Sequence, residues 1–475
     1  MTKVNEEVSI VIFGASGDLN KRKLMPALSE LFKVKVFTTH FNIVGFSRTD
    51  FSDDAFVEHL KKTSPYKDIG ADFFTHVSYV SGSYDSLEDF KKLAEHLKSR
   101  PQNRLFYMAV PPEQVMSICE NLSATGLCTK EKKNHFERII FEKPFGTNYE
   151  SSKELNQKLL QFFNEEQIYR IDHYLGKETV QNIMAFRFAN IIFEPLWNRS
   201  FVDYIDINVS EELGIVGRGE YFDHTGITRD VIQNHALQLL AMVAMEAPAN
   251  LNATAIRNEK VKLLSSIPAP LASLRGQYEG YHDEQGVKKN SQTETFSALK
   301  LSIENWRWAD TPIYIRAGKA LMEKSTEVSI FFKRVPHKLF KSAHINAIEP
   351  NALVFKIQPK EGIHLYFQSK NPGSGFKLSP VDMDFSYHNE YVSRISDAYE
   401  RLLLDALLGD ASLFIRGDEV EASWKIVDPV LKSWEENKEI PLHSYKKGQL
   451  GPDEMFDFIG KDGHAWNQSI CRLKL

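Results

Sequence analysis

The sequence predicts an α/β domain with a parallel sheet, followed by an α+β domain with a large, mostly antiparallel sheet. Three observations support this fold class. The chain has 475 residues, enough for about two to four domains. Short apolar runs alternate with amphipathic stretches over residues 1–175, as in parallel sheets covered by helices. Apolar and polar residues then alternate in successive runs, as in antiparallel strands joined by turns.

The first domain is predicted to be Rossmann-like and to bind a dinucleotide. Its first strand is the apolar run VSIVIFG, and the next stretch, NKRKLMPALSELF, has Leu24, Leu28 and Leu31 at helical spacing. Further strands are predicted from FNIVGFSR, RLFYMAVPP and HFERIIFEKPFG, with helices such as SLEDFKKLAEHLKSR between them. Strands that alternate with helices in this order form the dinucleotide fold, so residues 1–175 are assigned to this domain.

The pattern changes after about Gly176. The stretch KETVQNIMAFRFANIIFEPLWN predicts a long helix, and alternating runs then predict strands in VDYIDINVSEE, FSALKLSIEN, TEVSIFFKR, ALVFKIQP and GIHLYFQS. Two helical segments, RDVIQNHALQLLAMVAME and RISDAYERLLLDALLG, interrupt these strands. We expect residues 176–475 to form the second domain.

The composition predicts a globular protein of the cytoplasm. Hydrophobic residues make up 42% of the chain and charged residues 25%, which is ample for a large core. The formal net charge of -5 gives no sign of a basic surface, so no nucleic-acid partner is expected. No apolar run approaches about 18 residues, so no membrane span is expected. The three cysteines form no CxxC pair, and no signal peptide is recognised, which favours a reducing compartment.

The turn in VIFGASGDLNKRK ends the first predicted strand and begins the first predicted helix. Gly14 and Gly17 provide the close backbone approach that a pyrophosphate needs at a helix N-terminus. The G-x-x-G spacing is weaker than G-x-G-x-x-G, so an ordinary tight turn is the alternative. The position of the turn favours a cofactor site, because dinucleotide folds bind phosphate between the first strand and the first helix.

The end of the second predicted strand, GFSRTD, distinguishes between the two nicotinamide cofactors. An arginine at this place accommodates the 2′-phosphate of NADP, whereas an acidic residue holds the ribose hydroxyls of NAD. Arg48 follows the strand directly and favours NADP. Asp50 and Asp53 lie slightly beyond and could serve the NAD alternative.

Lys143, in EKPFG, follows the fourth predicted strand. The carboxyl ends of parallel strands meet at one edge of the sheet, where ligands bind. A lysine there is well placed to touch both cofactor and substrate, although a solvated loop lysine is the alternative.

A polar stripe crosses the otherwise apolar helix predicted from RDVIQNHALQLLAMVAME. In an α-helical projection, Asp230, Asn234 and Gln238 share a narrow arc, and His235 lies at its border. Buried polar groups need partners, so the stripe faces a wet pocket or forms an internal network. His235 is therefore either a structural histidine or a general base that removes the hydroxyl proton of an alcohol during hydride transfer.

Six motifs, in this order, closely resemble the glucose-6-phosphate dehydrogenase family: GASGDL, EKPFG, RIDHYLGKE, GRGEYFD, RDVIQNH and IRAGKAL. They span Gly14 to Lys324, and RIDHYLGKE, at residues 170–178, is highly specific to the family. The resemblance implies that the C1 hydroxyl of β-D-glucose 6-phosphate is oxidised to 6-phosphoglucono-δ-lactone and that NADP+ accepts the hydride. This reaction is the first step of the oxidative pentose phosphate pathway. The resemblance also implies the same two domains, with the second binding substrate and pairing in homodimers or homotetramers.

The resemblance further implies a role for each residue that matches a motif. His235 corresponds to the general base and Asp172 to its orienting carboxylate. The implied substrate contacts are His173, Tyr174 and Lys177 at the phosphate, and Lys143, Glu211, Asp230, Lys319 and Lys324 at the sugar. The implied cofactor contacts are Gly14, Ser16, Gly17, Asp18 and Leu19 at the pyrophosphate, Arg48 at the 2′-phosphate, and Lys143 at the nicotinamide. No metal ion is expected.

Two other functions remain as alternatives. An NADP-binding sensor or scaffold without catalysis would lack the base or the phosphate-binding residues, yet His235 and Lys177 are both present. A related sugar oxidoreductase with another substrate is disfavoured by the phosphate-binding stretch. Asn20 stands where the family often has a smaller residue, and we expect it to face solvent or the ribose. No role is assigned to Arg170 or Glu178.

Overall fold

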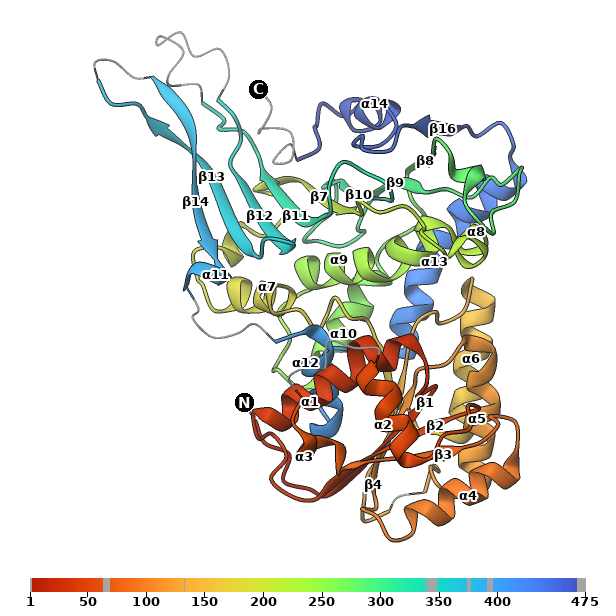
Figure 1. Ribbon diagram of the computed structural model, residues 1–475. Helices are drawn as coiled ribbons and strands as arrows, with labels where there is room; N and C mark the ends of the chain where they lie inside the picture. The colour runs from red at the N-terminus through yellow and green to blue at the C-terminus, as the bar shows by residue number, and fades with distance from the viewer. Residues whose placement is uncertain are drawn as a thin grey trace. The chain divides into compact units, whose positions relative to one another are not determined.

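A computed structural model describes residues 2–62, 69–131, 133–337, 339, 348–373, 377–390 and 396–467. The chain divides into two compact units (Figure 1). The first unit comprises Met1–Lys177, Pro248–Asn258 and Ile395–Glu421, and the second comprises Glu178–Ala247, Glu259–Arg394 and Ala422–Leu475. The unit that contains the N-terminus therefore includes two later segments. Within the described residues, no helix is both long enough and apolar enough to cross a membrane.

The first unit contains a seven-stranded sheet with the strand order β15-β6-β5-β4-β1-β2-β3. Its strands are β1 (Val8–Phe13), β2 (Phe41–Ser47), β3 (Val77–Ser81), β4 (Asn103–Met108), β5 (Glu137–Phe141), β6 (Ile168–Ile171) and β15 (Phe414–Ile415). The strands β1 to β6 pair in parallel, and β15 pairs antiparallel with β6. The predicted parallel sheet is thus confirmed, with one late strand added at its edge.

Helices cover this sheet on both faces. They are α1 (Met25–Lys33), α2 (Asp53–Lys62), α3 (Ala71–Phe74), α4 (Leu87–Leu97), α5 (Pro112–Ala124), α6 (Tyr149–Phe162) and α12 (Ala398–Leu408), with short turns η1 (Asn20–Leu24) and η3 (Glu165–Gln167). Val11 and Phe13 point from β1 into a core formed with α4, α5 and α6. Figure 1 shows α1 and α12 on the opposite side of the sheet from α5 and α6. Alternate residues of each strand are therefore buried on opposite faces, as both-sided cover requires.

The second unit contains a nine-stranded sheet with the order β14-β13-β12-β11-β7-β10-β9-β8-β16. Its strands are β7 (Val202–Ser210), β8 (Ala272–Tyr278), β9 (Phe296–Leu301), β10 (Ile313–Gly318), β11 (Ser325–Phe332), β12 (Ala352–Gln358), β13 (Gly362–Lys370), β14 (Leu378–Ser386) and β16 (Leu442–Tyr445). Neighbouring strands are antiparallel except for two parallel pairs, β7 with β10 and β8 with β16. The predicted large, mostly antiparallel sheet is confirmed.

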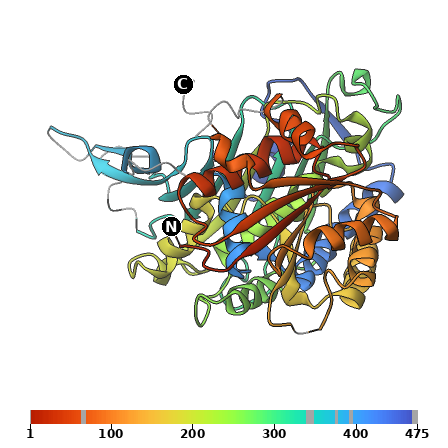
Figure 2. The same cartoon turned by 60° about the horizontal axis from the view of Figure 1, so that its bottom comes forward.

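The helices and helical turns of the second unit lie between or beside these strands. They are α7 (Glu178–Phe188), η4 (Glu194–Leu196), α8 (Gly219–Ile227), η5 (Thr228–Ala236), α9 (Leu237–Ala244), η6 (Tyr281–Asp283), α11 (Tyr387–Glu390) and α14 (Glu454–Gly460). Two further helices, α10 (Ala253–Leu264) and α13 (Gly417–Glu436), are each divided between the units: their first residues belong to the first unit and the rest to the second. Every residue of α9 is buried, so this helix forms part of the core. Figure 2 shows the β13–β14 pair projecting from the rest of its sheet.

Two predicted helices differ from the structure. The helix predicted over residues 177–198 ends at Phe188, where the Asn190 side chain donates to the Phe186 carbonyl oxygen at 3.0 Å. Side chains that bond nearby backbone in this way compete with helix continuation. The predicted helix RISDAYERLLLDALLG begins at Ala398 as α12, and it belongs to the first unit rather than the second.

Candidate active site

The turn after β1 adopts the backbone conformation that the sequence predicts. Gly14 has φ +79°, and a Cβ there would lie 2.0 Å from the Ala109 carbonyl oxygen, so only glycine fits. The Gly17 amide donates to the Gly14 carbonyl oxygen at 2.9 Å, which closes the turn. Asp18 is exposed and Leu19 is partly buried where the helical turn η1 begins. The turn therefore leads directly into a helix N-terminus, the place where phosphate binds in such folds.

The expectation that Asn20 faces solvent or the ribose is wrong. Its side chain is fully buried, and Asn20 Nδ2 donates to the Ala15 carbonyl oxygen at 2.6 Å. This hydrogen bond satisfies a backbone carbonyl that the turn would otherwise leave buried without a donor. Asn20 therefore supports the shape of the turn from inside.

Arg48 directly follows β2 and is exposed, with its guanidinium 5.6 Å from the centre of the Tyr84 ring. No carboxylate of a described residue lies within ion-pair distance of it. Asp53, the acidic alternative, is occupied, because its Oδ1 accepts a hydrogen bond from the Tyr79 amide at 2.6 Å. The Ser16 hydroxyl lies 2.8 Å from the Ser47 hydroxyl, which ties the phosphate turn to the end of β2. These contacts favour Arg48 over Asp53 as the residue that would contact the 2′-phosphate of NADP.

The segment after β6 places four predicted residues in one tight turn. Asp172 is 2% exposed, and its Oδ1 accepts a hydrogen bond from the Tyr174 amide at 2.9 Å. The His173 and Tyr174 rings lie 5.0 Å apart, and Lys177 Nζ lies 5.8 Å from the centre of the Tyr174 ring. Lys143 follows the neighbouring parallel strand β5. Tyr174 thus lies between His173 and Lys177. The imidazole, the phenol and the ammonium form a set of donors suited to a phosphate dianion.

Arg170, which had no assigned role, joins β6 to α6 and η3. It is 1% exposed and donates from Nη1 to Glu165 Oε1 at 2.6 Å and from Nη2 to Asn156 Oδ1 at 3.0 Å. A buried guanidinium is tolerated only when it is paired in this manner. Gly176 permits close packing, since a Cβ there would lie 2.7 Å from the Ala398 carbonyl oxygen at the start of α12.

In the second unit, the buried Lys319 side chain lies at the centre of an ion cluster. Lys319 Nζ is 2.6 Å from Glu211 Oε2 and 3.5 Å from Asp230 Oδ2. Glu211 follows β7 and Lys319 follows β10, and these two strands are parallel neighbours with Ser210 opposite Gly318. The carboxyl ends of the two strands therefore bring Glu211 and Lys319 together, and η5 adds Asp230. These polar groups can hold sugar hydroxyls at fixed angles.

Lys324 differs from Lys319 because its side chain is exposed. It is exposed directly before β11 and makes no hydrogen bond or ion pair with the part of the chain that the structure describes. Its predicted sugar contact stays a prediction.

The helix that carries Asp230 and His235 is not an ordinary α-helix. Residues Thr228–Ala236 form a π-helical segment, η5, which continues into α9. Residues five apart lie about 140° apart around an α-helix, whereas the i→i+5 bonds of a π-helix bring them near one line. Asp230 and His235 therefore approach one face more closely than the α-helical projection predicts. His235 is 4% exposed, and its amide donates to Asn234 Oδ1 at 2.6 Å.

Glu294 fixes the start of η5, and sequence reasoning did not find it. Its Oε1 accepts a hydrogen bond from the Thr228 amide at 3.1 Å, and burial raises the pKa of its carboxyl group. Gly226 has φ +69°, and a Cβ there would lie 2.5 Å from Glu294 Oε1. No local pattern could have revealed this contact, because Glu294 lies 66 residues from Thr228 in the sequence.

The predicted residues thus form two groups, one in each unit. The first contains Lys143 and the turn from Asp172 to Lys177, together with the phosphate turn and Arg48. The second contains Lys319, Glu211, Asp230 and His235. The expected pairing of Asp172 with His235 stays a prediction.

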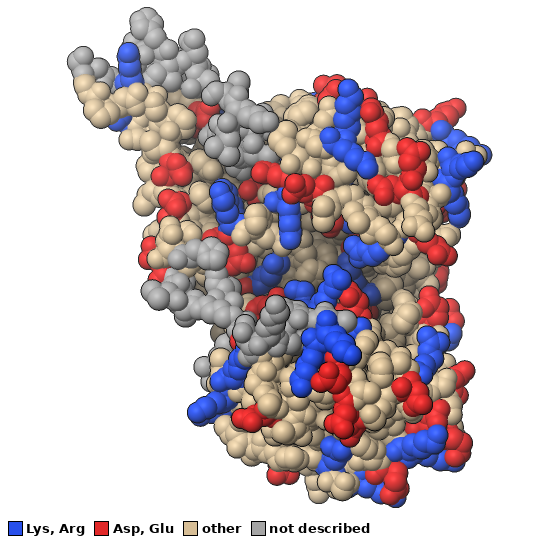
Figure 3. Space-filling view, viewed as in Figure 1, with Lys and Arg blue, Asp and Glu red and all other residues tan. Residues whose placement is uncertain are grey.

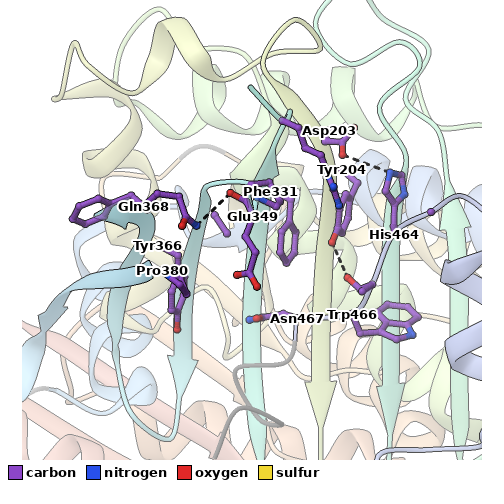
Figure 4. Close-up of a pocket in the computed structure, with 16 residues that line it drawn as sticks. Asp203, Tyr204, Phe331, Glu349, Tyr366, Gln368, Pro380, His464, Trp466 and Asn467 are labelled. Atoms are coloured by element: carbon purple, nitrogen blue, oxygen red, sulfur yellow. Dashed lines mark hydrogen bonds and ion pairs between the residues drawn. The ribbon is translucent and has the colours of Figure 1, made fainter. Parts of the chain in front are cut away.

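A separate cavity of about 260 Å³ lies on the sheet of the second unit and contains none of the predicted residues (Figure 4). Tyr204 of β7 donates to the Ala465 carbonyl oxygen at 2.7 Å, and its ring stacks on His464 with centroids 4.3 Å apart. The next residues of this segment are also bound, since the Asn467 amide donates to Asp206 Oδ2 at 2.8 Å. Residues 463–467 are therefore part of the wall of this cavity.

Asp206, beneath this segment, is expected to make stability depend on pH. Burial raises the pKa of Asp206 from 3.8 to about 6, although Arg316 and the Asn467 amide lower it. A raised folded-state pKa means that the contribution to stability is present below about pH 4 and is lost as pH rises through about 6. Asp206→Asn cannot titrate, so its unfolding free energy relative to wild type should rise by about 2 kcal/mol between pH 4 and pH 7.5. Thermal or urea unfolding across this pH range measures the difference.

Asp203→Asn is the matched control, because Asp203 lies on the same strand and its side chain is 38% exposed. The same measurement on Asp203→Asn gives the effect of losing an exposed carboxylate from this strand. A flat profile for Asp206→Asn would contradict the raised pKa.

The comparisons with known proteins cover both units. Residues 11–182 match the family model described as glucose-6-phosphate dehydrogenase, NAD binding domain, and residues 184–467 match that of the C-terminal domain. A glucose-6-phosphate 1-dehydrogenase of Aggregatibacter actinomycetemcomitans is 43% identical, and the alignment covers 99% of each chain. A relative from Chlamydia pneumoniae with the same name is 41% identical over 96% of this chain and 95% of its own.

Solved structures agree with this result. A glucose-6-phosphate dehydrogenase in complex with its substrate glucose-6-phosphate superposes with a TM-score of 0.89 at 36% identity, covering 98% of this chain and 100% of the other. The glucose-6-phosphate 1-dehydrogenase of Mycobacterium avium gives 0.84 at 36% identity, covering 97% and 98%. Matches of this extent, together with the phosphate turn, the Asp172–Lys177 turn and the Lys319 cluster, establish that this chain belongs to the glucose-6-phosphate dehydrogenase family.

Proposed function

We propose that this protein oxidises β-D-glucose 6-phosphate at C1 to 6-phosphoglucono-δ-lactone and transfers the hydride to NADP+, with His235 as the general base. The observation that carries this proposal is the family match, which extends over nearly the whole chain. As a member of the family, the protein is an NADP-dependent oxidoreductase of carbohydrate metabolism, in the first step of the oxidative pentose phosphate pathway.

The first unit is proposed to hold the cofactor. NADP+ supplies the hydride acceptor when it is bound. The backbone amides of the turn formed by Gly14, Ser16, Gly17, Asp18 and Leu19 are placed to bind its pyrophosphate. The exposed guanidinium of Arg48 binds the 2′-phosphate, and Lys143 positions the nicotinamide.

Residues of both units are proposed to bind the sugar phosphate. His173, Tyr174 and Lys177 donate to the phosphate, as their common turn and mutual contacts support. The Lys319 cluster with Glu211 and Asp230 supplies donors and acceptors for sugar hydroxyls, as do Lys143 and Lys324. Binding through the remote phosphate orients the C1 hydroxyl, and orientation itself contributes to the rate.

The base must accept the proton of the C1 hydroxyl as the hydride leaves the same carbon. His235 suits this task, because a neutral imidazole is a proton acceptor near neutral pH. Asp172 is proposed to fix the tautomer of this imidazole and to stabilise the imidazolium after proton transfer. Neither role requires a change in the charge of Asp172.

We also propose a homodimer or homotetramer in the cytoplasm. An apolar cavity on the second unit is lined in part by Ile192, Phe201 and Val335, all of which are exposed. Exposed apolar groups gathered in this manner are typical of protein interfaces. Cys119 and Cys128 are free and buried, which fits a reducing compartment. Light scattering in solution gives the oligomeric mass, and a monomer would contradict the assembly.

The reaction is tested by following NADPH absorbance after addition of glucose 6-phosphate, glucose or buffer. Turnover is expected with glucose 6-phosphate only. Folded protein that shows no turnover would contradict the proposal, and turnover with glucose alone would favour a different sugar oxidoreductase. NADP+ binding without turnover of either sugar would favour a sensor or scaffold.

Arg48→Ala is expected to weaken NADP+ about 100-fold or more while NAD+ binding changes less than about threefold, because only NADP+ carries the 2′-phosphate. Cofactor titration by fluorescence measures both constants. Arg22→Ala is the matched control, since Arg22 is an exposed arginine near the same turn that pairs with Asp18 at 2.8 Å. Equal weakening of both cofactors by Arg48→Ala would refute the contact.

A further inference from the structure

Glu142 directly follows β5 and precedes Lys143, yet no role in the proposed reaction includes it. Tyr107 Oη donates a hydrogen bond to Glu142 Oε1 at 2.5 Å, and Tyr399 Oη donates to the same oxygen at 3.3 Å. Tyr107 belongs to β4 and is fully buried, and Tyr399 lies in the first turn of α12. Two hydroxyl groups from separate elements therefore meet on one carboxylate oxygen.

The surroundings of these groups determine which atoms carry protons. Burial raises the pKa of Tyr107 and of Tyr399 well above the usual value, and the charge of Glu142 raises both further. Both phenols therefore keep their protons and donate them in hydrogen bonds to Glu142. Hydrogen bonds donated to a carboxylate stabilise its ionised form. The two donors therefore lower the pKa of Glu142, against burial, which raises it.

This charge is felt by two residues of the proposed site. Burial raises the pKa of Glu142, the Tyr107 and Tyr399 hydroxyls and the Lys143 ammonium lower it, and the Asp172 carboxylate raises it. Glu142 and Lys143 follow β5, and Asp172 follows its parallel neighbour β6. Glu142 therefore interacts electrostatically with both Lys143 and Asp172.

The helix that brings Tyr399 is fastened to the same strand at both ends. Arg138, near the start of β5, donates from Nη1 to the carbonyl oxygens of Ala406 and Leu407 at 2.8 and 2.7 Å. Tyr399, at the other end of α12, reaches Glu142 just beyond the end of β5. Eight helical residues rise about 12 Å, and four strand residues about 13 Å, so the two elements match in length.

The start of α12 is also fixed. Asp397 Oδ1 accepts a hydrogen bond from the Tyr399 amide at 2.9 Å, and Glu400 completes a capping box. Such caps set the first helical residue and stabilise it by about 1 kcal/mol. The Tyr399 hydroxyl is therefore placed by the helix cap at its own end of α12.

We propose that Glu142 is a positioning residue for the reaction: fixed by Tyr107 and Tyr399, its carboxylate holds the Lys143 ammonium in place and limits the pairing of Lys143 with Asp172. This inference rests on the proposed function, in which Lys143 contacts substrate and nicotinamide and Asp172 serves the base. Without the charge at Glu142, the Lys143 ammonium shifts toward Asp172. Lys143 then no longer contacts the substrate and nicotinamide correctly, and Asp172 no longer orients the base.

Steady-state kinetics of Glu142→Gln test the proposal, because glutamine keeps the shape and removes the charge. We expect kcat for glucose 6-phosphate to fall about 10- to 100-fold, while the Kd of NADP+ changes less than about threefold. Glu142→Asp keeps the charge and should retain more activity than Glu142→Gln. Tyr107→Phe and Tyr399→Phe each remove one donor and should lower kcat by about threefold to tenfold.

Arg138→Met is the matched control, since it loosens α12 at the opposite end and leaves the contacts of Glu142 in place. It should lower the melting temperature and leave kcat within about twofold of wild type. The proposal is overturned if Glu142→Gln has wild-type kinetics, if Glu142→Asp is the weaker of the two, or if Arg138→Met reproduces the loss of kcat. A wild-type protein that fails to oxidise glucose 6-phosphate would instead overturn the proposed function.

Discussion

Replacing His235 with asparagine is expected to lower kcat by about 100- to 10,000-fold, while KM for glucose 6-phosphate changes less than about threefold. Asparagine can occupy much of the space of the 4% exposed imidazole, but it cannot accept a proton near neutral pH. The lost interaction is made only as the hydroxyl proton leaves, so the effect belongs to kcat. NADPH absorbance under saturating conditions measures it.

His224→Asn is the matched control, because His224 lies on the preceding helix α8 and is exposed. It should behave as wild type. Comparable melting temperatures for the two variants would show that the loss is chemical. A loss of less than about tenfold in His235→Asn would mean that another group is the base and that His235 is the structural histidine left open by the sequence.

The second large effect is expected for Lys319→Met, which should lower kcat/KM for glucose 6-phosphate by about 100-fold or more. Lys319 is 2% exposed and lies between Glu211 and Asp230, so its removal leaves two carboxylates facing each other. The Lys319 ammonium is buried, whereas the Glu211 and Asp230 side chains are 35% and 15% exposed, so its loss costs about 1 kcal/mol or more. The melting temperature should therefore fall as well, and KM should rise because a hydroxyl contact is lost.

Lys300→Met is the matched control, because it replaces a surface lysine with the same residue. Lys300 lies on β9 and pairs with Asp462 at 2.8 Å on the surface, where such pairs contribute about 0–1 kcal/mol. Its kinetics should match those of wild type. If Lys319→Met folds and keeps kcat/KM within threefold of wild type, the cluster is structural and does not bind the sugar.

Local sequence patterns predicted the parts of the site that depend on strand ends. The Gly14 turn, Arg48 after β2 and Lys143 after β5 all follow from the rule that ligands meet the carboxyl edge of a parallel sheet. The Lys319 cluster obeys the same rule, because β7 and β10 are a parallel pair inside a mostly antiparallel sheet. That pairing joins strands about a hundred residues apart, and no periodicity shows it.

The parts that were missed have a common physical cause. The π-helical segment has only nine residues, too few for its apolar spacing to be distinguished from that of an α-helix. Glu294 and Asn20 act through buried hydrogen bonds to backbone, which leave no compositional signal. The contacts of Glu142 depend on Tyr399, a residue that lies 257 positions later in the chain.

The sequence predicts the sign of the net charge, but it does not predict where the charged side chains lie on the surface. Lys and Arg side chains are interspersed with Asp and Glu side chains on the face shown in Figure 3. Such a surface agrees with the small net charge of -5.

The late arrival of α12 and β15 affects how the chain can fold during synthesis. The edge strand β6 is complete by Ile171, but its antiparallel partner β15 begins only at Phe414. Domains emerge from the ribosome at about 5–20 residues per second, so β6 stays an open edge for about 10–50 s. The first unit therefore cannot close before most of the second unit has been made. Folding of the nucleotide-binding half is thus tied to completion of the whole polypeptide, and the last steps have high contact order.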